Sequence, residues 1–396
     1  MLDPNPPSGG PQRRLGRSDR TPVGLWFWEI DRLLLFLALL LIAIGLIAVA
    51  AASPSTAHRY AQRAERVSDL YYFWRQLGWA AVAIPVMLLT SMLSRPAAKR
   101  LALSGAAVFF TTMLLVPVIG TEVNGAQRWL GSGMARIQPS EFFKPFFAVA
   151  MAWLLSLKLV DDKLPVVGIT AAATGLVVAL LMLQPDFGQT VVIASIWAVL
   201  VVLSGLKLRT IAAGAVAFVV AIVGAYFLYP VARTRIDSFL FAQGDLFQVE
   251  RARATITSGG WLGKGPGGGD VKFSLPEAHT DYIFSVIGEE FGLIACALIA
   301  GIFALIVLRA YAKVLDEDDL FATLAVAGLT TQLGVQAAIN MAVNVDLAPS
   351  KGMTLPFVSY GGSSMIALAL GYGLLLAFTR RNPYLARSPY RVTWTR

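Results

Sequence analysis

The chain has 396 residues, of which 56% are hydrophobic and only 14% are charged, and its mean hydropathy is +0.65. A soluble domain of this size would carry about 25% charged residues, so the composition excludes an ordinary soluble enzyme. The net charge of +9 falls mostly in short segments between apolar runs, which favours anionic membrane lipids as partners and no nucleic acid.

Apolar runs of membrane-spanning length recur along the chain after an N-terminal tail. The tail, residues 1–30, is rich in Pro, Gly and Arg and is predicted to be disordered. The first run, 33–52, holds twenty residues without a charge and can cross a ~30 Å hydrocarbon core. It is too long and begins too late for a cleavable signal peptide, so we expect it to stay as an anchor. Ten spans are predicted, at about 33–52, 77–94, 101–120, 141–157, 165–183, 188–205, 210–229, 282–311, 321–345 and 363–379.

Lys and Arg in the short connecting segments indicate the orientation of these spans. An even number puts both termini on one side, and the basic tails and the 95–100 loop favour the cytoplasm for that side. The long loop 230–281, between the seventh and eighth spans, is then extracytoplasmic. The sequence therefore predicts an all-α polytopic membrane protein of about ten transmembrane helices, with a membrane domain at 31–382 and a second cytoplasmic tail at 383–396. The single cysteine, Cys296, excludes a disulfide framework.

The first cluster of polar residues lies in the predicted outer loop NGAQRWLGSGMARIQPSEFFKP (124–145). Arg128 and Trp129 are adjacent there, although the membrane topology does not require a cation at this place. An interfacial anchor is the simpler interpretation of Trp129, because most membrane tryptophans have that role. Ser140 can cap the next span, with Glu141 favourably placed beside the helix N-terminus.

The glycine-rich segment GGWLGKGPGGGD (259–270) does not match a nucleotide-binding loop. Lys264 is followed by Gly265 rather than by Ser or Thr, and no nucleotide pool is expected outside the membrane. We expect a flexible or turn-rich surface loop. The two histidines, His58 and His279, have no spacing with Cys or carboxylates that suits a structural metal site.

Carboxylates gather where the eighth span begins, in SLPEAHTDYIFSVIGEEFG (274–292). Asp281 is placed to act as an N-cap for a helix that starts at Tyr282. It also follows a loop that is longer than a plain connector needs, which favours a functional role. Glu289 and Glu290 fall inside the apolar run, where an acidic residue facing lipid costs about 2.5–3.5 kcal/mol. We therefore expect both to face other helices or a water-filled cavity.

A polar stripe in the ninth span offers a complement to these two glutamates. It repeats every four residues, at Gln332, Gln336, Asn340 and Asn344. Two interpretations remain open. The stripe can supply interhelical hydrogen bonds that stabilise the bundle, at about 0.6 kcal/mol each, or it can line a cavity.

The chain resembles the FtsW/RodA family of shape, elongation, division and sporulation proteins over about residues 30–382. Four motifs carry the resemblance, in this order along the chain: NGAQRWL…QPSEFFKP, QPDFGQT (184–190), LPEAHTDYIFSVIGEEFG and PSKGMTLPFVSYGGSS (349–364). The long cytoplasmic tail, VNGAQRWL and LPFVSYGGSS favour the cell-division branch of the family. One position departs from the pattern, because relatives often carry an acidic residue eight positions before the aspartate that matches Asp281, and Phe273 stands there.

The resemblance implies a peptidoglycan glycosyltransferase. Such enzymes polymerise lipid II into a nascent glycan strand at the outer face of the bacterial cytoplasmic (inner) membrane, together with a class B penicillin-binding protein that crosslinks the strands. The cell-division branch further implies the septum and other divisome membrane proteins as partners. The essential aspartate of the family matches Asp281, and its conserved loop tryptophan matches Trp129.

Glycosyl transfer from a polyprenyl pyrophosphate needs a base for the acceptor 4-hydroxyl and cations for the leaving group. Asp281 suits the first role, and general-base catalysis is typically worth about 10²–10⁴ in rate. Arginine suits the second, because it can grip a pyrophosphate through two hydrogen bonds. The substrate-binding candidates are Arg128, Trp129, Arg233, Arg235, Glu277, His279, Lys351 and Ser359. The candidates for lining or supporting a cavity are Glu289, Glu290, Gln336, Asn340 and Asn344.

These residues do not by themselves require a cofactor, although a divalent cation (Mg²⁺ or Mn²⁺) could share the pyrophosphate with Asp281 as a ligand. One base without an evident nucleophile predicts single displacement, with net inversion at the anomeric carbon.

A lipid II flippase is the alternative function, since the polar stripe and the two intramembrane glutamates would also suit a headgroup pathway. The candidate residues crowd at the predicted outer face, however, whereas alternating access places its site near the midplane. A scaffold that only docks division proteins would leave the charged outer loops without a role.

Overall fold

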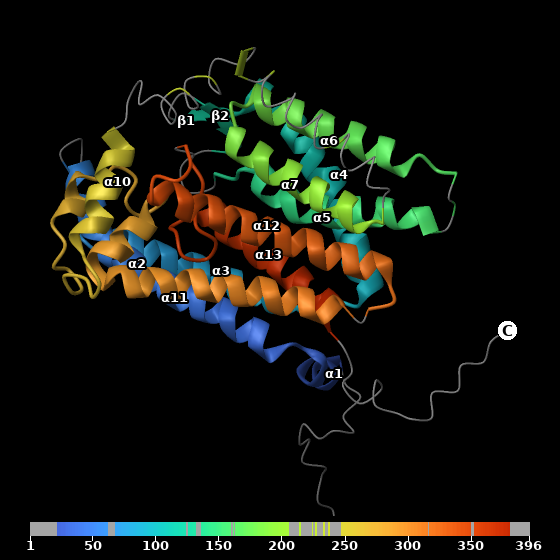
Figure 1. Ribbon diagram of the computed structural model, residues 1–396, viewed down its shortest axis with the longest axis horizontal. Helices are drawn as coiled ribbons and strands as arrows, with labels where there is room; N and C mark the ends of the chain where they lie inside the picture. The colour runs from blue at the N-terminus through green and yellow to red at the C-terminus, as the bar shows by residue number, and fades with distance from the viewer. Residues whose placement is uncertain are drawn as a thin grey trace, which may run out of the picture.

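The computed structural model describes residues 22–61, 68–123, 126–131, 136–159, 161, 163–205, 247–315, 317–349 and 352–380, together with six isolated residues between 206 and 246. In these parts of the chain the structure is almost entirely helical (Figure 1). The helices and strands are α1 (Pro22–Glu29), α2 (Arg32–Ala61), α3 (Tyr71–Ser91), α4 (Arg95–Ile119), β1 (Thr121–Val123), β2 (Ala126–Trp129), α5 (Pro139–Ser156), η2 (Leu157–Leu159), α6 (Val166–Leu183), α7 (Phe187–Leu203), α10 (Phe247–Ser258), η3 (Val271–Ser274), α11 (Ile283–Val314), α12 (Leu320–Asn344) and α13 (Gly362–Thr379).

Eight of the described helices are long and apolar enough to cross a membrane, and α7 is a shorter apolar helix of 17 residues. All of the predicted spans except one coincide with these helices. The exception, 210–229, lies almost wholly outside the described residues. The all-α polytopic membrane class predicted from the apolar runs is therefore confirmed.

Three parts of the fold differ from the sequence predictions or add to them. Residues 22–29, which fall in the tail expected to be disordered, form α1, with Pro22 at the helical position where its missing N–H has least effect. Strands β1 and β2 form an antiparallel hairpin in the loop after α4. The helix α10 and the turn η3 lie in the long loop before α11.

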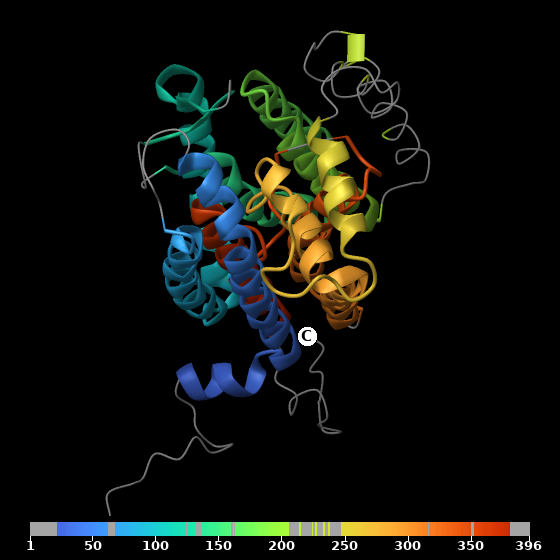
Figure 2. The ribbon, with the colours of Figure 1, turned by 90° about the vertical axis from the view of Figure 1, so that its left-hand side faces the viewer.

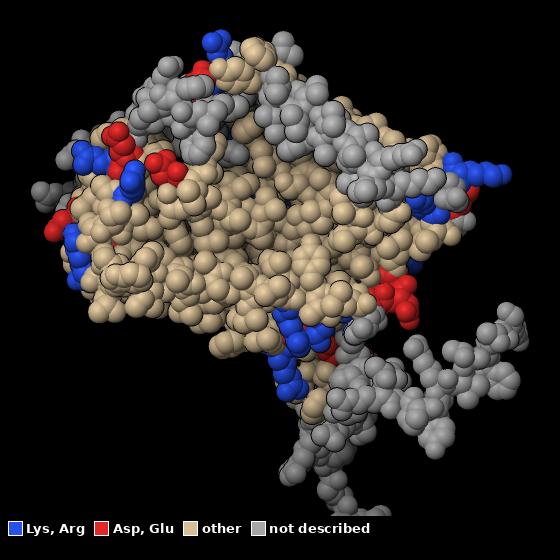
Figure 3. All heavy atoms as spheres, viewed as in Figure 1, with Lys and Arg blue, Asp and Glu red and all other residues tan. Residues whose placement is uncertain are grey.

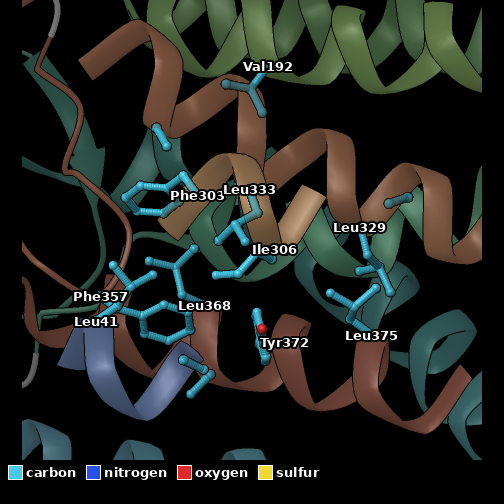
Figure 4. Close-up of a cluster of buried hydrophobic side chains, with 14 of the residues drawn as sticks. Leu41, Val192, Phe303, Ile306, Leu329, Leu333, Phe357, Leu368, Tyr372 and Leu375 are labelled. Carbon is cyan, nitrogen blue, oxygen red and sulfur yellow. The ribbon is translucent and has the colours of Figure 1, made fainter. Parts of the chain in front are cut away.

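The centre of the bundle is formed by α12 and α13. Their membrane-length segments are 72% and 78% buried, whereas that of α4 is 17% buried. Apolar side chains from three helices meet there: Phe303 and Ile306 of α11, Leu333 of α12, and Leu368 and Tyr372 of α13 (Figure 4). The central helices are thus enclosed by the others, and the outer helices present apolar side chains to lipid.

Both described chain ends lie at the same end of the bundle, where α1 runs across the foot of α2 (Figure 2). Asp31 joins helix ends there. Its Oδ1 accepts the Leu34 backbone N–H at 3.1 Å, while its Oδ2 pairs with Arg309 Nε and Lys313 Nζ, each at 3.0 Å. Arg380, just after α13, donates to a carbonyl at the end of α3. Charged side chains gather near the ends of the bundle and leave a band without charged residues between them on the face in Figure 3.

The close contact of α2 with the segment before α13 depends on Gly45. A Cβ at this position would lie 2.8 Å from the Val358 Cα, which is backbone and cannot move aside. We expect Gly45→Ala to cost about 1–3 kcal/mol and to lower the thermal unfolding temperature of the detergent-solubilised chain. Gly175→Ala in α6, where a Cβ meets nothing within 4 Å, is the matched control. Equal unfolding temperatures for the two variants would contradict this packing.

Candidate active site

Asp281 lies in the loop that precedes α11, and hydrogen bonds from α12 hold the backbone of this loop. Its carbonyl oxygen accepts from Asn340 Nδ2 at 2.9 Å and from Asn344 Nδ2 at 3.0 Å. Asn340 Nδ2 also donates to the Met353 carbonyl at 2.6 Å. Asn340 and Asn344 of the predicted polar stripe therefore supply interhelical hydrogen bonds, and they join the Asp281 loop to the segment 352–361. We call the end of the bundle that holds these two segments the Asp281 end.

Asp281 is not the N-cap residue of α11. The helix begins at Ile283, its N-cap residue is Tyr282, and no side chain of that residue caps it. The first turn is instead bonded by α12, because Asn344 Oδ1 accepts from the Ser285 N–H at 3.0 Å and from its hydroxyl at 2.8 Å. The carboxylate is half-buried, and a Cβ on Gly352 would lie 3.4 Å from its Oδ2. The N-cap position predicted for Asp281 is therefore occupied by Tyr282.

The segment before α13 fixes the residues immediately before Asp281. Ser359 Oγ donates to the Thr280 carbonyl at 2.7 Å, and the Tyr360 N–H donates to the His279 carbonyl at 2.8 Å. Glu277 Oε2 accepts from the Thr280 hydroxyl at 2.9 Å. Ser359 is only 4% exposed, so the structure gives this substrate-binding candidate a role in holding the loop.

His279 is buried against three aromatic and hydroxyl side chains. Its ring lies 4.3 Å from that of Tyr72 and 5.2 Å from that of Tyr360, and its Nδ1 is 3.2 Å from Thr56 Oγ1 near the end of α2. Burial lowers the pKa of His279 to about 3. The imidazole is therefore neutral at physiological pH, and it joins α2 and α3 to the Asp281 loop.

Glu289 and Glu290 bind the long loop before α11 instead of the polar stripe of α12. Both are fully buried. Glu289 accepts from the Val271 N–H at 2.8 Å and from the Lys272 N–H at 2.9 Å, and it pairs with Lys264 at 3.3 Å. Glu290 pairs with the buried Lys272 ammonium. The expected complement from the ninth span is thus wrong, and the partners lie 17 to 31 residues earlier in the chain.

The glycine-rich segment 259–270 is turn-rich, as predicted, but it is bonded to a break in α11. Gly292 has φ 81° and interrupts the helix. The break frees backbone carbonyls of α11, which accept hydrogen bonds from the loop. The Lys264 N–H donates to the Glu289 backbone carbonyl at 2.9 Å, and the Gly265 N–H donates to the Glu290 backbone carbonyl at 3.0 Å. Gly263, with φ 80°, has no room for a side chain because a Cβ would lie 2.6 Å from the Phe291 nitrogen. The glycines therefore allow a close backbone approach, and of the two predicted forms the structure shows the turn-rich one.

Arg128 is bound to the turn between α6 and α7. Its Nε donates to the Gln184 carbonyl at 3.0 Å, another guanidinium nitrogen donates to the Pro185 carbonyl, and its Nη1 lies 3.8 Å from Asp186 Oδ1. Trp129 ends β2, where its carbonyl accepts from the Thr121 hydroxyl at 3.2 Å. Both residues are half-buried in the hairpin region.

A buried polar network crosses the bundle beside these segments. The Lys144 ammonium, fully buried, lies 2.9 Å from Glu141 Oε2 and donates to Gln336 Oε1 at 2.8 Å. Gln189 of α7 donates to the other Glu141 oxygen. Gln336 Nε2 donates to the Thr354 carbonyl at 3.0 Å, which carries the network into the segment 352–361.

Some of the predicted site residues are not assembled with Asp281 in the structure. Lys351 and Arg235 lie outside the described residues. Arg233 is described on its own, with its Nε 3.5 Å from Asp237. Within the described ranges, no group of three or more His, Cys, Asp or Glu side chains could hold a metal ion, and a divalent cation shared by Asp281 and the substrate pyrophosphate stays a prediction.

One residue at this end was not among the sequence candidates. Arg75, in the first turns of α3, is half-buried, and its guanidinium carbon lies 5.4 Å from the centroid of the Tyr71 ring and 6.0 Å from that of Tyr360. Arg75 follows the aromatic run YYFW and lies in none of the four sequence motifs.

The fold and the polar groups at one end define a polytopic helical membrane protein with a candidate site at a membrane surface. Over residues 31–384 the chain matches the cell cycle protein family of FtsW, RodA and SpoVE. It is 39% identical, over 93% of each chain, to the probable peptidoglycan glycosyltransferase FtsW of Caulobacter vibrioides. It is 36% identical to that of Aromatoleum aromaticum, over 88% of this chain and 87% of the relative. The chain therefore belongs to the FtsW/RodA/SpoVE family.

Solved structures share this fold. A chain from a peptidoglycan synthase complex that coordinates polymerisation and crosslinking has a TM-score of 0.73 and 29% identity, over 88% of this chain and 97% of that one. The rod shape determining protein RodA of Thermus thermophilus has a TM-score of 0.64 and 28% identity, over 88% of this chain and 96% of its own.

The low pKa of His279 predicts a pH dependence of stability. Because the folded pKa of about 3 lies below the ordinary value of 6.5, the unfolded chain binds a proton that the folded chain excludes as the pH falls through 6.5. We expect the unfolding temperature to fall between about pH 7 and about pH 5, and His279→Gln to weaken this dependence. His58→Gln is the control. A pH dependence in His279→Gln equal to that of the natural chain would contradict the assignment.

The buried ion pair of Lys272 with Glu290 predicts a large loss of stability when one partner is removed. Glu290→Gln leaves the ammonium without a counter-charge, which costs about 3–5 kcal/mol. In a thermal unfolding scan, Glu290→Gln should have a lower unfolding temperature than the natural chain. Glu250→Gln, which alters an exposed residue of α10, should unfold at the same temperature as the natural chain. If the transition of Glu290→Gln stays in place, the ion pair does not hold the loop.

Proposed function

We propose that the chain is a peptidoglycan glycosyltransferase that polymerises lipid II, with Asp281 as the general base. Glycan polymerisation agrees with the activity in the names of its FtsW relatives, which match over most of the chain. The observation that carries the assignment of Asp281 is the way its loop is held. Two asparagines bind its carbonyl, so the backbone is fixed at a place where the half-buried side chain lies beside Gly352 of the segment 352–361.

The proposed reaction is a single displacement at the anomeric carbon of the donor sugar. The 4-hydroxyl oxygen of the acceptor forms the new bond, its proton passes to the Asp281 carboxylate, and the bond to the polyprenyl diphosphate breaks with both electrons going to the leaving group. The configuration at the anomeric carbon inverts. Gly352 lies beside the Asp281 carboxylate, and Lys351 precedes it in the sequence. Of the cations in the sequence motifs, Lys351 is therefore the candidate that best suits the leaving diphosphate.

Two of the other candidates fit different tasks in this proposal. Arg128 uses three of its groups on the turn at 184–186, so we propose that it positions the hairpin that carries Trp129. Glu277, bonded to Thr280, shapes the loop before Asp281. Arg233 and Arg235 remain candidates for binding the sugar-linked phosphates.

The buried network argues against a flippase. Glu141, Lys144, Gln189 and Gln336 bond to one another across the bundle, and Glu289 and Glu290 bond to the long loop. A headgroup pathway needs polar groups that can exchange partners, whereas these are enclosed and paired. The polymerase therefore fits these residues better.

We further propose that a crosslinking transpeptidase of the class B penicillin-binding type is the partner of the chain, in agreement with the peptidoglycan synthase complex that shares its fold. The similarity to FtsW relatives supports action at the division septum of the bacterial cytoplasmic membrane, beside other division proteins. The Asp281 end would then face outward, where lipid II is consumed.

The proposed base is tested by Asp281→Asn, which keeps the shape of the side chain and removes its basicity. With the cognate transpeptidase present, we expect the rate of lipid II polymerisation by the purified chain to fall by about 10²–10⁴ with an unchanged unfolding temperature. Asp346→Asn, at an exposed carboxylate of the same end, should polymerise at the natural rate. Normal glycan synthesis by Asp281→Asn would remove Asp281 from the reaction.

A further inference from the structure

Arg75 is a half-buried cation at the Asp281 end whose anionic partner is missing from the described part of the chain. Arg128 has Asp186 at 3.8 Å, Lys264 has Glu289 at 3.3 Å, and Lys272 pairs with Glu290. No described carboxylate comes within ion-pair distance of Arg75, and the hydrogen bond found for its guanidinium is to the Tyr71 hydroxyl, at 3.0 Å.

This environment leaves donors of the guanidinium available for a ligand. A guanidinium carries five N–H donors in a planar fork, and the bond to Tyr71 uses one of them. The faces of Tyr71 and Tyr360 hold the group in place, which lowers the conformational entropy lost on binding. The fork matches two oxygens of a phosphate, and partial burial strengthens the attraction.

Arg75 is also joined closely to the loop that carries Asp281. Tyr360, over which it lies, donates from its backbone to the His279 carbonyl and has its ring 5.2 Å from the imidazole. The next residue, Gln76, donates to the Ser359 carbonyl at 3.1 Å. Burial raises the pKa of the Tyr360 hydroxyl, and the nearby Arg75 cation opposes this rise.

The height of Arg75 along the bundle suits a lipid phosphate. It lies in the first turns of a membrane-length helix, directly after Trp74, which is 62% exposed. Exposed tryptophans at helix ends mark the boundary between hydrocarbon and water, which is where the phosphates of a membrane-anchored substrate must lie.

We infer that Arg75, held between Tyr71 and Tyr360, binds the diphosphate of a polyprenyl-linked saccharide. This inference rests on the proposed function and adds to it a cation that the sequence motifs did not include. The polyprenyl chain lies in the membrane beside α3, the diphosphate lies on the guanidinium, and the sugar extends toward the loop of His279 and Asp281.

The test measures binding to the full-length chain in lipid nanodiscs, with undecaprenyl diphosphate, undecaprenyl monophosphate and phosphatidylglycerol as separate probes. Arg75→Gln should bind undecaprenyl diphosphate roughly tenfold or more weakly, since it loses charge-assisted hydrogen bonds. Its binding of phosphatidylglycerol should change much less. Arg253→Gln, an exposed arginine of α10 at the same end, should bind all three probes as the natural chain does.

Undiminished diphosphate binding by Arg75→Gln would overturn the inference, and so would an equal loss for phosphatidylglycerol, which would indicate a general lipid contact. If Arg75→Gln unfolds, Arg75→Lys replaces it. The lysine keeps the charge and loses the fork, so weaker diphosphate binding supports the site and natural affinity overturns it. If Arg75→Gln weakens diphosphate binding and the natural chain makes no glycan, the proposed function is contradicted and the binding site at Arg75 is not.

Discussion

The carbonyl oxygen of Asp281 accepts hydrogen bonds from Asn340 and Asn344, two residues one turn apart on the central helix α12. Asn344 also bonds the first turn of α11, and Asn340 bonds Met353. These buried bonds therefore join three chain segments at one point, and they fix the backbone of the aspartate without using its carboxylate. A buried carbonyl without such partners would cost free energy, so the arrangement is specific to this loop position.

The same end of the bundle is held from the other side by the break in α11 at Gly292. The freed carbonyls bind the glycine-rich loop, and Glu289 and Glu290 bind the residues that follow it. The short helical piece that begins at Ile283 is thus fixed at both of its ends. This piece starts two residues after Asp281, so the loop of 259–274 and the asparagines of α12 together determine where the carboxylate lies.

The sequence predicted the spans well, because a run such as 33–52 is a local signal of membrane length. It also selected Asp281 and the asparagines of α12. The partners of the two glutamates were missed, since Lys264 and Lys272 lie in a loop without periodicity. Arg128 was expected to bind phosphate, but its guanidinium is bonded to backbone carbonyls. The pattern of side chains in a sequence gives no signal for such backbone partners. Arg75 is distinguished by Tyr360, which lies 285 residues further along the chain, and only the fold brings the two together.

An experimental structure of the full chain with lipid II and an acceptor glycan bound tests the proposed role of Asp281 most directly. We expect the acceptor 4-hydroxyl within about 2.6–3.2 Å of an Asp281 carboxylate oxygen, with the loop carbonyl still bonded to Asn340 and Asn344. An acceptor hydroxyl that lies beyond the reach of one bridging water, with another side chain of the protein in contact with it, would contradict the account.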